Sequence, residues 1–389
     1  MSSAALAAED STLFWPFRIL SWILGLFFKK GWDWDNMSKA FEATDKLIDE
    51  LSQPNGDYPS VSISAKDIAW GEPQKKSGVT LRAGSFPSPL AHLLPPESKD
   101  CQFLLVTPTS SSSSTYIVML PATGEMGKRE RLALAKTFAR DQGYASIIVT
   151  APFYARRKPS GQKRFFLDHV ADALVSSQAI VQETTSVVRY IMRSNDDNQI
   201  IPASPSNKVV VTGFSWGSAM SSMTCATSLL AGVDGKRLAC VAYVGCSSPE
   251  VFADGVIENG VDWNAVLKDK AKMSSFQGVD VSSLETPQQV QAAMLKILSQ
   301  VQLSSSVDAL VKKDPTNRLA AVKTYSMYDD GFLPRKYSSS YVDQMKRLTK
   351  MSNFQARWMP GGHILGAMLR PVLHKKAIVD AVHKMDKDS

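Results

Sequence analysis

A glycine–serine motif at 213–217 is the part of the sequence best suited to chemistry. Ser215 stands in Gly-Phe-Ser-Trp-Gly, with one glycine two positions before it and one two positions after it. The β-branched run 208–212 precedes the motif and small residues follow it, which is the pattern of a strand turning sharply into a helix. Such a turn presents a serine hydroxyl as a nucleophile. The alternative is an ordinary strand–helix turn without a chemical role.

A serine hydroxyl needs a general base to take its proton and an acidic residue to orient that base. With this kind of turn, the chain order is expected to be Ser, then Asp or Glu, then His. After Ser215, only His363 follows a predicted strand, at 354–359. His374 and His383 fall on a predicted terminal helix and are expected at the surface. A capping or packing role is the alternative for His363.

Two adjacent aspartates follow the predicted strand at 321–328. We favour Asp330, because the run from Asp330 to Pro334 fits the D-x-x-V-P pattern that usually follows this strand. Asp329 is then the exposed neighbour. Ser215, Asp330 and His363 are therefore the predicted catalytic residues.

Acyl transfer also requires N–H groups that bind the oxyanion of a tetrahedral intermediate. The amide of Trp216, directly after the serine, is the first predicted donor. The second is expected in the loop that follows the predicted strand at 116–120. Thr123 is preferred there and Ala122 is next, since Pro121 has no N–H group to donate.

A basic loop follows the predicted strand at 145–150. It contains Arg156, Arg157 and Lys158, with two further cations close behind. Because loops at this end of the sheet overhang the nucleophile, these three residues are predicted to bind an anionic group such as a phosphate. The alternatives are a solvated loop and a loop that docks on a membrane surface.

The elements that position these residues alternate along the chain. Strands are also predicted at 79–85, 102–107, 208–212 and 238–244, and helices at 128–140, 168–193, 218–230, 336–349 and 364–384. This alternation predicts an α/β fold with a mostly parallel central sheet flanked by helices. The first strands are close together, which suits an antiparallel start.

A long gap separates the strand at 238–244 from the strand at 321–328, too long for an ordinary connection. Within it, Thr286, Pro287 and Gln289 form a capping box that starts a helix. A helical cap is therefore predicted at 247–318, inserted into a core formed by 61–246 and 319–389. A helical segment at 1–60 precedes them.

Composition narrows the class of protein. The 389 residues are 44% hydrophobic and 21% charged, which excludes a chain that is mainly disordered or coiled coil. Four cysteines without a C-x-x-C pair favour reduced thiols inside a cell over disulfides or structural zinc. The net charge of +7 suits anionic surfaces, but no nucleic-acid-binding motif is present, so no nucleic-acid partner is expected.

The segment 13–34 combines an apolar run with a basic and tryptophan-containing end. The uninterrupted apolar run 19–28 is shorter than the roughly 17–25 residues of a spanning helix. Lys29, Lys30, Trp32 and Trp34 follow it, which favours peripheral contact with a membrane interface. A buried helix or a cover over the active site is the alternative.

Several runs of the sequence each match one motif of a known set. Residues 152–162 follow P-Y-Y-G-x-R-K-P-x-x-Q with two departures, and 213–218 follow G-x-S-M-G-G with Trp and Ser in place of Met and the last Gly. A Gly-Trp step ends 28–32, T-G-D becomes T-G-E at 123–125, and P-G-x-H closes the pattern at 360–363. In these runs the chain resembles the α/β-hydrolase family that includes α/β-hydrolase domain-containing protein 18.

The resemblance implies an α/β-hydrolase fold and a serine hydrolase acting on lipid acyl esters, without a metal or other cofactor. It also implies a mitochondrial location and a leaning toward anionic lipid of the cardiolipin type. Two alternatives remain: an acyltransferase with the same three residues, and a non-catalytic α/β-hydrolase fold that binds or scaffolds membranes.

Overall fold

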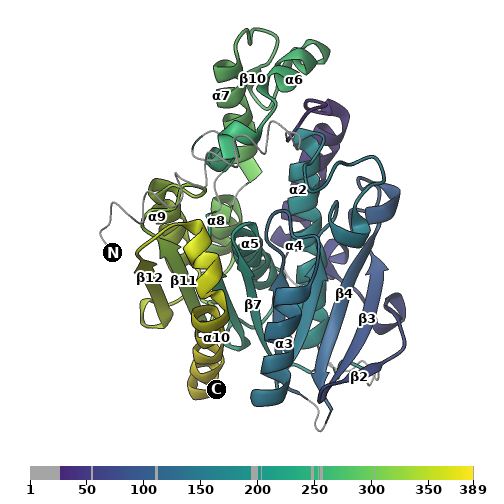
Figure 1. Cartoon of the computed structure of the whole chain (residues 1–389), viewed down its shortest axis with the longest axis vertical. Coiled ribbons are helices and arrows are strands. Elements are labelled where there is room, and N and C mark those ends of the chain that lie inside the picture. Colours follow the sequence, from purple (N-terminus) through teal and green to yellow (C-terminus); the bar gives the residue numbers. More distant parts are fainter. Residues whose placement is uncertain are drawn as a thin grey trace.

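The structure, a computed structural model, describes residues 27–53, 56–109, 113–193, 200–202, 204–246, 249–252, 254, 257–301 and 303–388. One large sheet organises these residues (Figure 1). Its strands run in the order β1-β3-β4-β6-β5-β7-β8-β11-β12, with β2 paired to β3. Their bounds are β1 Ala69–Trp70, β2 Gln74–Lys76, β3 Val79–Pro87, β4 Asp100–Pro108, β5 Thr115–Leu120, β6 Ala145–Thr150, β7 Lys208–Phe214, β8 Leu238–Tyr243, β11 Ala321–Met327 and β12 Phe354–Met359.

The direction of the strands confirms the predicted α/β fold. β3 pairs antiparallel with β4, and β4 pairs antiparallel with β6. From β6 through β5, β7, β8 and β11 to β12 every pairing is parallel. All residues of β5, β6 and β8 are buried, as expected for strands covered by helices on both faces.

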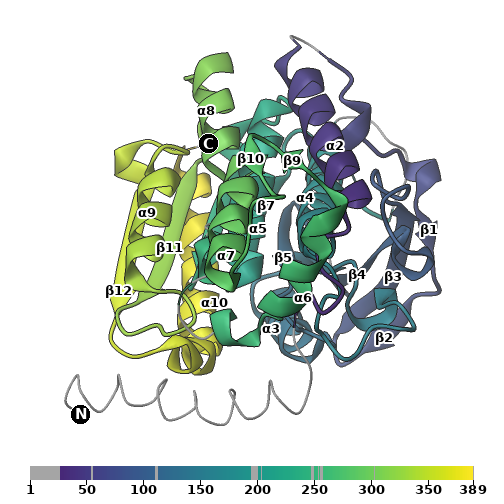
Figure 2. The same cartoon turned by 90° about the horizontal axis from the view of Figure 1, so that it is seen from above.

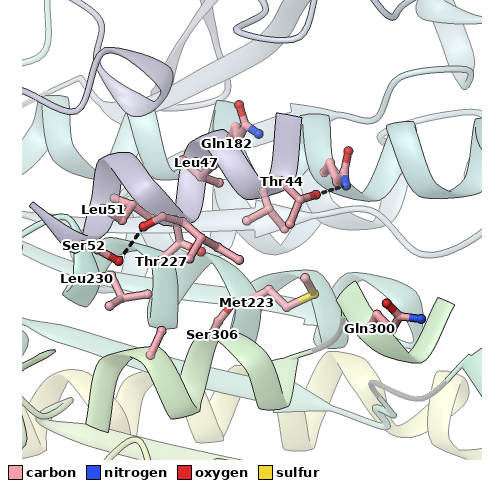
Figure 3. A pocket seen from close by; sticks show the side chains of 14 residues that line it. Thr44, Leu47, Leu51, Ser52, Gln182, Met223, Thr227, Leu230, Gln300 and Ser306 are labelled. Carbon is pink, nitrogen blue, oxygen red and sulfur yellow. Dashed lines mark hydrogen bonds between the residues drawn. The ribbon is translucent and has the colours of Figure 1, made fainter. Parts of the chain in front are cut away.

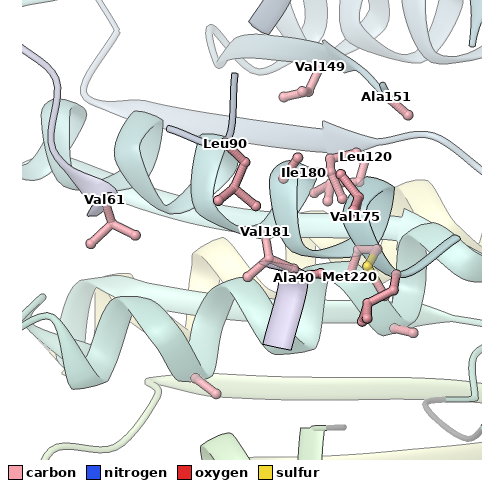
Figure 4. Close-up of a cluster of buried hydrophobic side chains, with 14 of the residues drawn as sticks. Ala40, Val61, Leu90, Leu120, Val149, Ala151, Val175, Ile180, Val181 and Met220 are labelled. Atoms are coloured by element: carbon pink, nitrogen blue, oxygen red, sulfur yellow. The ribbon is translucent and has the colours of Figure 1, made fainter. Parts of the chain in front are cut away.

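Helices cover both faces of the sheet (Figure 2). α3 (Arg129–Asp141) and α10 (His363–Asp388) pack on one face, and α4 (Val170–Met192) and α5 (Trp216–Leu230) pack on the other. Successive residues of a strand point to opposite faces. Ile117 and Met119 therefore join the cluster under α3 and α10, whereas Val118 and Leu120 join the cluster with α4 and α5. Figure 4 shows part of this second cluster around Leu120 and Val175.

The gap between β8 and β11 is filled by short elements, and all but the last of them lie above one end of the sheet (Figure 1). These are α6 (Trp263–Lys268), β9 (Ser275–Phe276), β10 (Val279–Asp280), α7 (Pro287–Leu298) and α8 (Leu303–Lys313). The predicted capping box starts α7: the Thr286 hydroxyl accepts from the Gln289 amide at 3.3 Å. α8 packs against α5, so this segment also contributes to the core. The predicted domain boundaries stay a prediction.

Residues 27–34 are built into the protein. Phe28 and Trp32 are fully buried, and the rings of Trp32 and Trp34 stack with centroids 4.5 Å apart. The indole N–H of Trp32 donates to the Val266 carbonyl in α6 at 3.1 Å. These two tryptophans, predicted to flank an interfacial segment, therefore pack against the segment between β8 and β11. The segment 13–26 lies outside the described residues. Among the helices that the structure describes, none has the length and apolarity to cross a membrane. α2 (Trp34–Ser52) follows directly.

Candidate active site

Ser215 lies in a strained turn between β7 and α5. β7 ends at Phe214 and α5 begins at Trp216, so the single residue Ser215 makes the turn, with a φ of 56°. Only glycine fits at both flanking positions, because a side chain there would clash with the backbone. A Cβ on Gly213 would lie 2.2 Å from the Gly217 carbonyl oxygen, and a Cβ on Gly217 would lie 2.5 Å from that of Pro121. The glycine spacing in the sequence thus produces the tight turn that the motif predicts.

His363 and Asp330 meet at the ends of neighbouring strands. Nδ1 of His363 lies 2.8 Å from Oδ2 of Asp330, and the aspartate side chain is 1% exposed. The other carboxylate oxygen, Oδ1, accepts the backbone N–H groups of Phe332 at 2.9 Å and Leu333 at 2.7 Å. These amides fix the carboxylate, which in turn orients the imidazole.

Two aromatic rings flank the imidazole of His363. Phe214 lies on one side with centroids 5.0 Å apart, and Phe332 lies 5.1 Å away. Asp329 has a different position: its carboxylate accepts from the Gly361 amide at 3.2 Å, which ties the loop after β11 to the loop after β12. Of the two candidate aspartates, Asp330 is therefore the one that contacts the histidine.

One cavity of about 440 Å³ is bordered by both Ser215 and His363. Thr123 and Trp216, the two predicted oxyanion donors, also line it. The remaining walls are mostly apolar and include Phe27, Phe165, Leu167, Met220, Phe252, Ile257 and Leu298. A cavity of this size and character is typical of a site for an apolar ligand. Phe27 reaches it from the N-terminal segment.

The loop at 121–125 is held by a buried arginine. Nε of Arg131 donates to Oε1 of Glu125 at 2.7 Å, and Nη1 donates to the carbonyls of Met119 at 2.8 Å and Val149 at 2.7 Å. Oε2 of Glu125 in turn accepts the Ala122 amide at 3.3 Å. Arg131 therefore ties the ends of β5 and β6 to this loop. Neither role was predicted from the sequence, although Glu125 stands within the T-G-E run.

The basic loop needs a correction at Arg157. Its guanidinium is fully buried and forms two hydrogen bonds with the Glu183 carboxylate, at 2.6 and 2.8 Å. It cannot bind a headgroup there, because its charge is already paired inside the protein. The Lys158 ammonium donates to the Gln162 carbonyl at 2.7 Å, within its own loop. Arg156 is exposed, as headgroup binding would require.

His374 was predicted at the surface and is buried. Nε2 lies 2.5 Å from the Thr212 hydroxyl, one residue before Gly213, and the ring stacks on Tyr243 with centroids 4.9 Å apart. Burial, and then the charge of Arg370, lower the pKa of His374 well below its ordinary value. The signal was available in the sequence: on a helix, position 374 shares a face with Ala377, Ile378 and Ala381, which are all buried.

Within the part of the chain that the structure describes, no three His, Cys, Asp or Glu side chains are grouped so that they could hold a metal ion. The four cysteines are buried, and none forms a disulfide.

One protein family and several solved structures are similar to this chain. The family described as alpha/beta hydrolase domain containing 18 matches residues 25–384. A PEG-bound cold-adapted esterase from an Arctic intertidal metagenomic library shares 12% identity at a TM-score of 0.46, covering 80% of this chain and 98% of that one. TT1662 from Thermus thermophilus shares 16% identity at a TM-score of 0.43, and the match covers 73% of this chain and 93% of that one. Acetyl xylan esterase 1 from Thermoanaerobacterium sp. shares 13% identity at a TM-score of 0.41, and the match covers 83% of this chain and 86% of that one.

Proposed function

Because the chain belongs to the alpha/beta hydrolase domain containing 18 family, we propose that it is a serine hydrolase that cleaves acyl esters of lipids. One observation carries the proposal. An imidazole oriented by a buried carboxylate, with 2.8 Å between Nδ1 and Oδ2, borders the same apolar cavity as a serine held in a strained turn. These are the groups that ester cleavage by a serine requires.

In the proposed reaction, the Ser215 hydroxyl oxygen attacks the ester carbonyl carbon while Nε2 of His363 takes the hydroxyl proton. Asp330 stabilises the imidazolium through Nδ1. The tetrahedral intermediate then expels the alcohol, which receives the proton from His363, and leaves the acyl group on Ser215. A water molecule, deprotonated by His363, then attacks this acyl-enzyme. The fatty acid leaves as Ser215 takes that proton back from His363.

The oxyanion is proposed to bind the amides of Trp216 and Thr123. Trp216 is the first residue of α5, so its N–H has no partner within the helix and lies at the positive end of the helix dipole. Of the two loop candidates, Ala122 already donates its N–H to Glu125. Thr123 is therefore the better second donor.

An apolar cavity supports a lipid acyl group as the substrate, and cations in the loops that contribute Gly124, Tyr154 and Phe165 to its wall support an anionic headgroup. Burial, followed by the charges of Arg131 and Arg156, lowers the pKa of Lys128 to about 8. A lysine whose protonated form is destabilised by burial and by neighbouring cations gains from a nearby anion such as a phosphate. Lys163 and Arg164 are exposed in the loop that leads to Phe165 in the cavity wall. Cardiolipin-type lipid at a mitochondrial membrane is the substrate and location that we propose first.

Release of fatty acid from lipid vesicles tests this proposal. Vesicles of phosphatidylcholine alone are compared with vesicles that also contain cardiolipin, using the wild type and Ser215→Ala. We expect fatty acid from the wild type, faster with cardiolipin, and none from the variant. Transfer of the acyl group to an added alcohol or thiol, in place of water, would favour the acyltransferase. Vesicle binding by a folded wild type that releases no fatty acid would favour the scaffold.

A further inference from the structure

A second cavity, of about 70 Å³, lies among α2, α4, α5 and α8 (Figure 3). One side chain, Met223, lines both this cavity and the larger one that contains Ser215. Methionine is unbranched and flexible, so it can fill a junction in one rotamer and open it in another. The two cavities are therefore separated at one point by a movable side chain.

The two cavities follow the same helices, one after the other. On α5, the larger cavity is lined by Trp216, Ala219 and Met220, and the smaller one by Thr227 and Leu230. These residues, with Met223 in the middle, repeat every three or four positions and form one stripe along the helix. On α4, the lining likewise passes from Ala173, Leu174 and Ser177 to Gln178, Val181 and Gln182. Both helices thus line first the cavity at Ser215 and then the second cavity.

The distance along α5 from Ser215 to the second cavity matches the length of a membrane lipid chain. At 1.5 Å per residue, Met223 lies roughly 12 Å along α5 from Ser215, and Thr227 lies roughly 18 Å away. Since a hydrocarbon core of about 30 Å holds two layers of acyl chains, one such chain spans about 15 Å. A chain bound as an ester at Ser215 and extended along α5 would therefore end beyond Met223, inside the second cavity.

The chemistry of the second cavity suits an alkyl chain. Leu47, Leu51, Val181 and Leu230 contribute apolar walls. Two of its hydroxyl groups are bonded to their own helix: Thr44 donates to the Ala40 carbonyl at 3.0 Å and Ser52 to the Ile48 carbonyl at 2.7 Å. An alkyl chain would therefore not strip these hydroxyls of their partners.

We propose that the two cavities form one acyl-chain channel and that Met223 sets the length of chain the enzyme accepts. This inference rests on the proposed function, since it assigns the substrate of the same site as a long, unbranched acyl ester. Short chains occupy only the cavity at Ser215. Long chains displace the Met223 side chain and place their ends between α2 and α8.

Chain-length profiles of position 223 variants test the channel. kcat/KM is measured for p-nitrophenyl butyrate, octanoate and palmitate with the wild type, Met223→Trp, Met223→Ala and the size-matched control Met223→Leu. Met223→Trp should lower the palmitate-to-butyrate ratio by tenfold or more, at roughly fourfold for each methylene that loses its buried position. Met223→Ala should raise the ratio or leave it unchanged. Met223→Leu, which keeps the size but not the flexibility of methionine, should lower the ratio less than Met223→Trp does.

Thr227→Leu provides a second variant if Met223→Trp does not fold. It fills the far cavity only, so it should lower the activity toward palmitate and spare octanoate and butyrate. A folded Met223→Trp or Thr227→Leu with a wild-type chain-length profile would overturn the channel and leave the proposed function intact. A wild type that cleaves none of the three esters would instead overturn the proposed function, and the channel with it.

Discussion

Asp330 and His363 lie 33 positions apart in the chain, yet Oδ2 of the aspartate is 2.8 Å from Nδ1 of the histidine. The contact forms because β11 and β12 are parallel neighbours, so the loops that follow them meet at the same edge of the sheet. Ser215 reaches this edge from β7, at the cavity that His363 also lines. Parallel strands thus bring together three residues from distant parts of the chain.

Asp330→Asn should remove most of the activity with little effect on folding. The asparagine side chain retains an oxygen that can accept the Phe332 and Leu333 amides, but its NH₂ group cannot stabilise the imidazolium. In serine hydrolases with this arrangement, such a change lowers kcat by about 10⁴-fold. Steady-state ester hydrolysis gives kcat, and the thermal midpoint serves as the folding control. An Asp329→Asn variant with the larger loss would contradict the assignment.

Arg157→Met should destabilise the protein strongly. It leaves the buried Glu183 carboxylate without its partner, which costs about 3–5 kcal/mol in the free energy of unfolding. The double variant Arg157→Met/Glu183→Gln should recover much of that loss, because no unpaired charge remains. Urea unfolding of the two variants measures both values. If Arg157→Met is as stable as the wild type but binds anionic vesicles weakly, Arg157 contacts the headgroup after all.

Acid should destabilise the wild type through His374. Its native pKa lies well below the ordinary value, whereas the unfolded histidine takes a proton near pH 6.5. Below that pH the unfolded state binds a proton that the native state does not, so stability falls as the pH falls.

We expect the wild type to lose about 2 kcal/mol more than His374→Gln between pH 6.5 and pH 5. Urea unfolding at several pH values gives the two curves, and all other ionisable groups are the same in both proteins. Parallel curves would contradict the prediction that His374 is buried and uncharged in the native state.

Lys128 and Arg156 should affect anionic substrates selectively. Removing both charges, in Lys128→Gln/Arg156→Gln, should raise KM for an anionic phospholipid by roughly tenfold or more, since hydrogen bonds to charged groups contribute about 1.5–3 kcal/mol each. KM for p-nitrophenyl butyrate should not change. Lys75→Gln, on the exposed strand β2 at the far end of the sheet, is the matched control (Figure 1).

The same cluster predicts a pH effect. Because the pKa of Lys128 is about 8, its charge is lost above that pH, and KM of the wild type for the anionic lipid should rise between pH 7 and pH 9. An equal rise for the neutral ester would show that the effect lies elsewhere.

The strands and the residues at their ends could be predicted from the sequence. The run at β6 is mostly apolar and β-branched, and the run at β12 alternates apolar residues with Gln355 and Arg357. Both end before turn residues, and both predicted ranges equal the observed ones. α5 begins two residues earlier than predicted, at Trp216, because the turn occupies Ser215 alone. The local pattern around a motif thus determines where the elements begin.

Contacts between distant elements could not be predicted in this way. Arg157 stands in a run of cations, and only the fold shows that α4 brings Glu183 to it. The Arg131–Glu125 pair likewise depends on how α3 packs beside the 121–125 loop. Whether a charged side chain is buried depends on a partner far along the chain, and local sequence does not contain that information.

Labelling with a fluorophosphonate probe tests the central claim most directly. The probe reacts with a serine only when a base activates its hydroxyl, and mass spectrometry of the labelled peptide identifies the serine. We predict one labelled site, Ser215, in the wild type, and no labelling of folded Ser215→Ala or His363→Ala. A folded wild type that is never labelled, or that is labelled at another residue, would contradict the assignment of Ser215 as the nucleophile.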